Sequence, residues 1–227
     1  MTASARSRLV SGHWSRATAG LLTRDHRLEV PLDRSGAGDR LPGGAAAITV
    51  YTREICLAES AAVDPLAKPP LVFLQGGPGC EAPRPSADAG LGWLGALLEH
   101  HRVLLVDQRG TGLSTAIDRP DAGGGPVATA RLLTHVRADE IVEDCEDLRR
   151  ALGIERWSLL GQSFGGFCVT RYLSAHPESV GTAFLTGGLP AVGRSIDEVY
   201  ALTYAAMRRR SEDFYARYPA DRDRMAA

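Results

Sequence analysis

The chain has 227 residues, of which 44% are hydrophobic and 23% are charged, and its formal net charge is −1. This length is sufficient for one large hydrophobic core, and the composition is that of a globular protein rather than a disordered or fibrous one. The near-zero net charge excludes a general electrostatic attraction to nucleic acid or to an anionic membrane surface.

The first part of the chain predicts a loose segment followed by an antiparallel pair of strands. Residues 1–25 are mostly polar and small, without the apolar core of a signal peptide. Residues 28–32 alternate apolar positions with polar or proline positions, which indicates an edge strand because Pro31 lacks a backbone donor. A Gly-rich turn separates this strand from a second one over residues 47–55.

The middle of the chain alternates short apolar runs with helical patterns. The runs, which predict strands buried on both faces, are residues 71–74, 103–106, 157–160 and 180–186. Helices are predicted over residues 91–98 and from an N-cap at Asp139 to Leu152, whereas the Pro/Gly-rich residues 115–130 predict a loop. This order predicts an α/β fold with a mostly parallel, doubly wound sheet.

The last part of the chain has helical character. Ser195 and Glu198 have the spacing of a capping box, which predicts a helix start. The three arginines 208–210 are expected to form the solvated end of this helix, where cations suit the helix dipole, rather than a binding patch. A second helix is predicted from about Ser211.

The most informative motif is Gly161-Gln162-Ser163-Phe164-Gly165-Gly166, between a predicted strand and a predicted helix. In this setting Gly-x-Ser-x-Gly is typical of the nucleophile elbow of α/β hydrolases. Gly161 and Gly165 permit a tight turn that lifts the Ser163 hydroxyl above the sheet edge, and the turn leaves the Phe164 N–H free to meet an oxyanion. The alternative is a tight turn with an ordinary exposed serine.

Two further loops follow predicted parallel strands, at the sheet edge where open α/β sheets bind ligands. In the loop of residues 75–79, Gly76 and Gly77 supply a second pair of backbone amides, one of which can complete an oxyanion hole with that of Phe164. The alternative is a simple strand-ending turn fixed by Pro78.

In the loop of residues 107–114, Asp107 and Arg109 are expected to be structural, with substrate binding by Arg109 as the alternative. Neither the four cysteines nor the six histidines have metal-ligand spacing, and no P-loop is present, so no metal or cofactor is expected. Unpaired cysteines predict free thiols and a cytoplasmic location. No stretch approaches the ~20 apolar residues of a membrane span. The oligomeric state is not predicted.

Together the three motifs resemble the proline iminopeptidase (prolyl aminopeptidase) family of α/β hydrolases. They are Gln-Gly-Gly-Pro-Gly (75–79), Asp-Gln-Arg-Gly-Thr-Gly-Leu-Ser (107–114) and Gly-Gln-Ser-Phe-Gly-Gly (161–166). The resemblance implies a serine peptidase that releases N-terminal proline from peptides, with a Ser-Asp-His triad under a helical cap. It implies Ser163 as the nucleophile and Gly76 and Phe164 as the oxyanion amides.

The resemblance also implies a domain organisation. Residues 26–190 correspond to the N-terminal part of the hydrolase core, and residues 191–227 to the start of the cap. Gln75 departs from the pattern, because many members of the family carry histidine at this position.

A larger departure concerns the triad partners, which follow the serine in this fold. The only later histidine is His176, about 20 Å along the predicted helix from Ser163 at 1.5 Å per residue. We therefore expect a sequence truncated within the cap, lacking the last core strands with the triad Asp and His, and an inactive or nearly inactive chain. An α/β-hydrolase esterase or lactonase, and a non-catalytic fragment or pseudoenzyme, are the alternatives.

Overall fold

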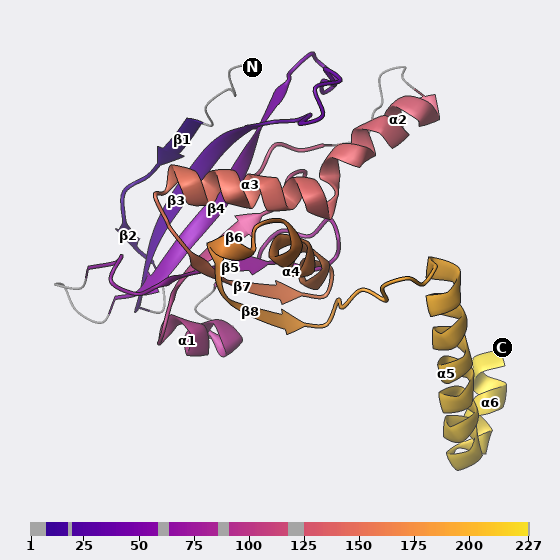
Figure 1. The fold of residues 1–227 in the computed structure, drawn as a ribbon. Helices are drawn as coiled ribbons and strands as arrows, with labels where there is room; N and C mark the ends of the chain where they lie inside the picture. The colour runs from indigo at the N-terminus through magenta and orange to yellow at the C-terminus, as the bar shows by residue number, and fades with distance from the viewer. Residues whose placement is uncertain (1–7, 18–19, 59–63, 86–90, 118–124, 227) are drawn as a thin grey trace. The chain divides into compact units, whose positions relative to one another are not determined.

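The computed structural model describes residues 8–17, 20–58, 64–85, 91–117 and 125–226. It divides into two compact units, Met1–Leu189 and Pro190–Ala227. The first, called here the core unit, is a sheet with helices on both of its faces, and the second, called here the helical unit, consists of two helices (Figure 1).

In the described residues, the core unit contains one mixed sheet of eight strands. The strands are β1 (Arg8–Ser11), β2 (Ser15–Arg16), β3 (Leu21–Pro31), β4 (Ala47–Leu57), β5 (Pro70–Leu74), β6 (Arg102–Asp107), β7 (Trp157–Gln162) and β8 (Val180–Thr186). Their order is β1-β3-β4-β6-β5-β7-β8, with β2 beside β3. Strands β6, β5, β7 and β8 run parallel to one another, whereas β4 is antiparallel to both β3 and β6.

Helices cover both faces of the parallel strands. They are α1 (Gly92–Leu98), α2 (Gly125–Leu133), α3 (Ala138–Ala151) and α4 (Phe164–Ala175). Helix α1 lies on one face, and α3 and α4 lie on the other (Figure 1). Along β5, Val72 and Leu74 pack with α3 and α4, while Leu71 and Phe73 pack with α1. Both faces of the strand are therefore buried, as its continuous apolar run predicted, and the doubly wound α/β fold class is confirmed.

A buried charge cluster lies at the end of β6 that is opposite Asp107. Glu54 on β4 is fully buried and pairs with Arg24 at 2.7 Å, with His26 at 3.0 Å and with Arg102. Burial by itself would raise the pKa of Glu54, but the hydrogen bonds from His26 and Arg24 and the charge of Arg102 outweigh it and lower the pKa to about 2. The cluster ties three strands together on one face of the sheet.

The N-terminal part of the core unit differs from the sequence prediction. Residues 8–25, predicted to be loose, contain β1, β2 and the first half of β3, and residues 1–7 lie outside the described part. Strand β3 is not an edge strand, because β1 pairs with it between His26 and Glu29. Pro31 is tolerated for another reason, namely that it is the last residue of β3 and lies beyond the pairing with the described part of β1.

Two predictions about the segment before the turn at Ser163 also need correction. The predicted loop of residues 115–130 includes the first part of α2, and its residues 118–124 lie outside the described part. Helix α3 begins at Ala138, with Arg137 rather than Asp139 at the N-cap position. Asp139 instead lies in the first turn, where a carboxylate also suits the helix dipole.

The helical unit contains α5 (Ile196–Arg217) and α6 (Pro219–Ala226). The predicted capping box is confirmed, because the Ser195 hydroxyl accepts from the Glu198 N–H at 3.2 Å and the Glu198 carboxylate accepts from the Ser195 N–H at 2.8 Å. The predicted helix end at residues 208–210 is wrong, since α5 continues through these arginines. No proline or glycine occurs between Ser195 and Pro219, so nothing in this stretch of sequence ends the helix earlier.

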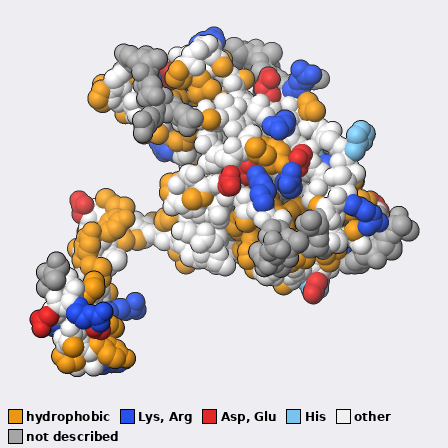
Figure 2. Space-filling view, turned by 180° about the vertical axis from the view of Figure 1, so that it is seen from behind, with side chains coloured by type: hydrophobic (Ala, Val, Ile, Leu, Met, Phe, Trp, Pro, Cys, Tyr) orange, Lys and Arg blue, Asp and Glu red, His pale blue; other side chains and the backbone are white. Residues whose placement is uncertain are grey.

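None of the residues of α5 is buried, and apolar side chains cover much of the surface of the helical unit (Figure 2). Its exposed apolar residues include Ile196, Tyr200, Leu202, Met207 and Phe214. Neither α5 nor any other helix in the described part of the chain combines the length and the apolar character needed to cross a bilayer.

Candidate active site

The three loops singled out in the sequence meet at one edge of the sheet. Strands β5, β6 and β7 are parallel neighbours, so their carboxyl ends lie side by side. The loops that follow them begin at Gln75, Gln108 and Ser163. The Gln108 amide donates to the Gln75 carbonyl at 3.0 Å, which joins the first two loops directly.

Ser163 forms the apex of the turn between β7 and α4. Its backbone has φ 51° and ψ −115°, and it is the only non-glycine residue with positive φ in the described ranges. The turn is held by hydrogen bonds from the Ser163 N–H to the Thr186 carbonyl, at 3.1 Å, and from the Gly166 N–H to the Ser163 carbonyl, at 2.8 Å. Ser163 is exposed. A conformation of this kind costs about 1–3 kcal/mol and is typical of functional sites.

The glycines around Ser163 are required by close backbone approach. A Cβ atom at Gly165 would lie 1.9 Å from the Leu74 carbonyl oxygen, and one at Gly161 would lie 2.3 Å from the Gly165 carbonyl oxygen. These approaches let α4 begin directly against the ends of β5 and β7. The start of α4 at Phe164 leaves the N–H of that residue outside the helix's own hydrogen-bond pattern.

The structure brings Gly76 beside Ser163. A Cβ atom at Gly76 would lie 2.9 Å from the Ser163 Cβ and 2.9 Å from the Gln162 carbonyl oxygen. The Gly76 N–H donates to the side-chain oxygen of Gln75 at 3.1 Å. No sequence pattern predicts this contact, in which the Gln75 side chain accepts from the amide that is predicted to bind an oxyanion. Gly77 and Pro78 continue the same loop and are joined by a cis peptide bond.

Asp107 organises the loop that follows β6. Its buried carboxylate accepts hydrogen bonds from the N–H groups of Ala82, at 3.0 Å, and Leu113, at 2.9 Å, and it pairs with Arg84. Gly112 passes so close that a Cβ there would meet the carboxylate at 2.3 Å. All of these partners belong to the core unit, so the carboxylate ties two loops to the end of the strand.

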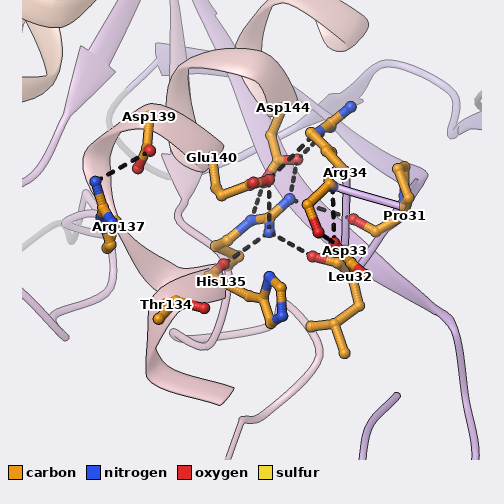
Figure 3. Close-up of polar contacts among 12 residues, drawn as sticks. Pro31, Leu32, Asp33, Arg34, Thr134, His135, Arg137, Asp139, Glu140 and Asp144 are labelled. Carbon is orange, nitrogen blue, oxygen red and sulfur yellow. Dashed lines mark hydrogen bonds and ion pairs between the residues drawn. The ribbon is translucent and has the colours of Figure 1, made fainter. Parts of the chain in front are cut away.

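Arg109 belongs to a buried polar cluster between the β6 loop, α3 and the end of β3. Figure 3 shows its partners Leu32, His135 and Asp144. Its guanidinium donates to both carboxylate oxygens of Asp144, at 2.7 and 2.6 Å, and to the carbonyls of His135 and Leu32, at 2.7 and 3.1 Å. Arg34 donates to the same Asp144 at 2.7 Å. The planar fork of an arginine suits this set of acceptors, and it leaves the guanidinium bonded to protein groups.

All six histidines lie in the described part of the chain, and none has a hydrogen bond to Ser163. His176, at the C-terminal end of the 12-residue α4, bonds Glu143 at 2.8 Å. His135 bonds Asp39 at 2.8 Å, and His26 belongs to the Glu54 cluster. The remaining three are His13, His100 and His101, of which the last two precede β6 at the opposite end of the strand from Asp107.

An apolar cavity of about 780 Å³ opens beside this site, within the core unit. Its walls come from the loops after β5 and β6, from the segment that joins α2 to α3, and from the first turn of α4. Within the described ranges, His, Cys, Asp and Glu side chains form no cluster suited to a metal ion.

Comparisons with known proteins agree with this fold. A family model described as the alpha/beta hydrolase fold matches residues 69–218, and the chain belongs to that family. Its sequence is similar to a proline iminopeptidase of Aeromonas sobria, with 45% identity over 202 residues, which is 88% of this chain and 45% of the relative. It is also similar to the proline iminopeptidase aneH of Aspergillus aculeatus, with 35% identity over 88% of this chain and 44% of the relative.

A solved proline iminopeptidase-related protein from Thermus thermophilus is similar at 28% sequence identity and a TM-score of 0.45, covering 71% of this chain and 44% of that one. The similarity to the two sequence relatives confirms the resemblance predicted from the three motifs. The chain spans less than half the length of the two curated relatives named above.

Proposed function

We propose that the protein is a serine hydrolase that releases N-terminal proline from peptides through an acyl-enzyme on Ser163. The observation that carries the proposal is the strained, exposed Ser163 with the backbone of Gly76 beside it. The sequence similarity to proline iminopeptidases supports the substrate class. In this proposal the turn of residues 161–166 is a nucleophile elbow.

In the proposed reaction the Ser163 hydroxyl oxygen attacks the carbonyl carbon of the N-terminal proline, and a base takes the hydroxyl proton. The N–H groups of Phe164 and Gly76 stabilise the tetrahedral oxyanion, which requires the Gln75 side chain to leave the Gly76 amide. Collapse of this intermediate breaks the peptide bond, the leaving amine takes the proton, and water then hydrolyses the acyl-enzyme. Acyl transfer of this kind needs no metal or cofactor.

The supporting residues keep these groups in place. Gly161 and Gly165 permit the turn, Gly77 and Pro78 shape the oxyanion loop, and the buried carboxylate of Asp107 fixes the neighbouring loop. Residues 191–227 are proposed to be the start of a helical cap, and the location is proposed to be cytoplasmic. The proposed substrate is a peptide; neither nucleic acid nor a membrane is proposed as a partner.

A second candidate is that this chain by itself is a non-catalytic unit with a hydrolase fold. This candidate rests on the positions of the histidines, because those with side-chain hydrogen bonds are engaged with Ser11, Asp39, Glu54 or Glu143 rather than with Ser163. A serine without a base is a poor nucleophile, and the loss of a triad member typically lowers the rate by orders of magnitude. We therefore expect the isolated 227-residue chain to be inactive or nearly so.

A fluorophosphonate probe and two substrates test the proposal. A protein that contains this chain and spans the full length of the curated relatives, called here the intact protein, is expected to hydrolyse a proline arylamide. Ser163→Ala should abolish that activity. Ser174→Ala, which changes an exposed serine on α4, should keep it. Turnover of a simple ester without turnover of the proline arylamide would favour an esterase or lactonase. Absence of both, with no probe on Ser163, would favour the non-catalytic candidate. Rapid labelling of Ser163 in the 227-residue chain would show that a base is present within it.

A further inference from the structure

The apolar cavity beside Ser163 has the size of a ligand pocket. Its volume of about 780 Å³ falls within the roughly 300–1,000 Å³ of small-molecule sites. The apolar walls come from Ile117, Leu133, Val136, Ile141, Phe164 and Phe167. The Phe164 and Phe167 rings lie with their centroids 6.5 Å apart on the first turn of α4. An apolar group of aromatic size can be buried against these walls.

The cavity is lined by residues that neighbour the proposed catalytic groups in the chain. Phe164, whose N–H is a proposed oxyanion donor, lines it and directly follows Ser163. Pro78 and Gly79, which also line it, belong to the loop that carries Gly76. A substrate whose scissile carbonyl lies at Ser163 therefore has a neighbouring residue within reach of the cavity.

Three polar side chains of the cavity wall are buried and held by other protein groups. The Gln108 side-chain amide donates to the Gln75 carbonyl at 3.0 Å, the Thr111 hydroxyl donates to the Gln108 carbonyl at 2.8 Å, and the Arg109 guanidinium is bonded to Asp144. Their hydrogen bonds direct these donors towards the protein rather than towards a ligand. Burying a polar group here without a partner would cost free energy, so the cavity favours an apolar one.

The charge of the cavity indicates which part of the substrate it accepts. Among the described residues that line it, none is acidic, and Arg109 and Arg137 are cationic. The nitrogen of an N-terminal proline is protonated at neutral pH, and a cation has no favourable partner in such a site. The residue that follows the proline carries no such charge, so its side chain can enter these walls.

We propose that this cavity binds the side chain of the residue that follows the N-terminal proline, with a preference for large apolar side chains. The proposal rests on the proposed function, since it assumes that a prolyl peptide bond is placed at Ser163. It identifies Phe167 as a residue that determines specificity.

Binding can be measured on the 227-residue chain by methyl NMR with isoleucine labelling. The sequence has six isoleucines, of which Ile117 and Ile141 line the cavity and Ile55 lies in the core on the α1 side of the sheet. Prolyl-phenylalaninamide is expected to shift the Ile117 and Ile141 methyl signals and to leave that of Ile55 unchanged. Prolyl-glycinamide is expected to shift none of them at the same concentration.

Two variants of α4 provide a matched pair. Phe167→Ala removes a cavity wall, whereas Leu173→Ala truncates a side chain of nearly equal exposure, 40% against 41%, that does not line the cavity. We expect Phe167→Ala to weaken binding of prolyl-phenylalaninamide at least about tenfold, and Leu173→Ala to leave it within about twofold. Equal shifts with both peptides, shifts that include Ile55, no shift at all, or equal effects of the two variants would overturn the proposal.

A third ligand separates this inference from the proposed function. Alanyl-phenylalaninamide presents the same side chain after a residue other than proline. If it shifts Ile117 and Ile141 as prolyl-phenylalaninamide does, the cavity recognises the second residue, and the inference is supported. Proline selectivity is tested independently by turnover of the proline arylamide in the intact protein, so a failure there with cavity binding intact would count against the proposed function alone.

Discussion

The core unit and the helical unit show two different ways in which a segment of this chain acquires structure. In the core unit, apolar side chains fill both faces of the parallel strands, and charged groups such as Glu54 and Asp144 are buried with partners. In the helical unit, α5 contains no buried residue. The core unit is thus specified by contacts between distant segments, whereas α5 is specified by signals within it, such as its capping box.

The largest effect is expected from a methyl group added at the turn of the core unit. Gly165→Ala places a Cβ 1.9 Å from the Leu74 carbonyl oxygen, so β5 and α4 must separate. We expect a loss of more than about 4 kcal/mol in the free energy of unfolding, measured by urea denaturation. The control is Gly181→Ala, where the nearest atom is at 3.6 Å and the loss should stay below about 1 kcal/mol. Equal stability of the two variants would contradict the close approach.

A buried and an exposed arginine test the same contrast between the units. Arg109→Leu leaves Asp144 without its bidentate partner in the core unit, which should cost about 3 kcal/mol or more. Arg194→Leu removes an exposed pair with Glu198 in the helical unit, which should have far less effect than Arg109→Leu, because water screens the exposed charges. Thermal unfolding of both variants checks this expectation, which a comparable loss in the two would refute.

Acid should destabilise the core unit through Glu54. Its pKa is lowered from an ordinary value of 4.5 to about 2, so the folded state binds its proton less readily than the unfolded state. The resulting stability, about 3 kcal/mol, is fully present above pH 4.5 and is lost as the pH falls from about 4.5 towards 2. Urea unfolding between pH 7 and pH 3 should show a smaller loss for Glu54→Gln than for the unsubstituted chain.

Two other carboxylates, Glu146 and Glu198, affect how the pH dependence of unfolding should be interpreted. Glu146, in the core unit, also has a pKa lowered to about 2, because hydrogen bonds from Arg149 and Tyr172 outweigh its burial. The Glu54→Gln profile should therefore flatten only in part. Glu198, which is exposed in the helical unit, should leave the acid profile of the core unit unchanged when replaced by Gln. Identical profiles for Glu54→Gln and the unsubstituted chain would contradict the prediction.

A smaller effect than those in the core unit is expected at the start of α5. Ser195→Ala removes the side-chain acceptor of the Glu198 N–H and should destabilise the first turn of α5 by about 1 kcal/mol. Faster hydrogen exchange over residues 196–199 would show it, with the unfolding of the core unit unchanged. Ser211→Ala, in the interior of α5, is the control and should not increase exchange at the helix start. A change in core stability on Ser195→Ala would mean that the two units are coupled.

Much of the candidate site could be predicted because its signals are local. The apolar runs before Gln75, Gln108 and Ser163 predicted neighbouring parallel strands, and parallel neighbours necessarily end at the same edge. The histidine positions were also visible, since the distance from Ser163 to His176 follows from helix rise alone. The alternation of side chains along β3 and β4 indicates which residues share a face of the sheet. No local pattern shows that the face carrying the charged members of the Glu54 cluster is buried.

Other features depend on contacts that no local pattern shows. The short segments β1 and β2 are strands only because β3 supplies their hydrogen bonds. The hydrogen bond from the Gly76 N–H to Gln75 depends on the side chain's conformation in the finished loop. The length of α5 was underestimated, because Arg208–Arg210 suits a helix end but does not require one.

The sequence by itself determined the order of the four parallel strands and of helices α1, α3 and α4, the tight turn at Ser163 and the identity of the loops at the edge of the sheet. These features follow from glycine content, apolar periodicity and capping residues, which act over a few neighbours along the chain. Only the tertiary structure decided that Gly76 adjoins Ser163, that Arg109 is enclosed by Asp144 and two carbonyls, and that an apolar cavity borders Phe164. Packing between segments far apart in sequence sets these distances, and no local preference encodes them.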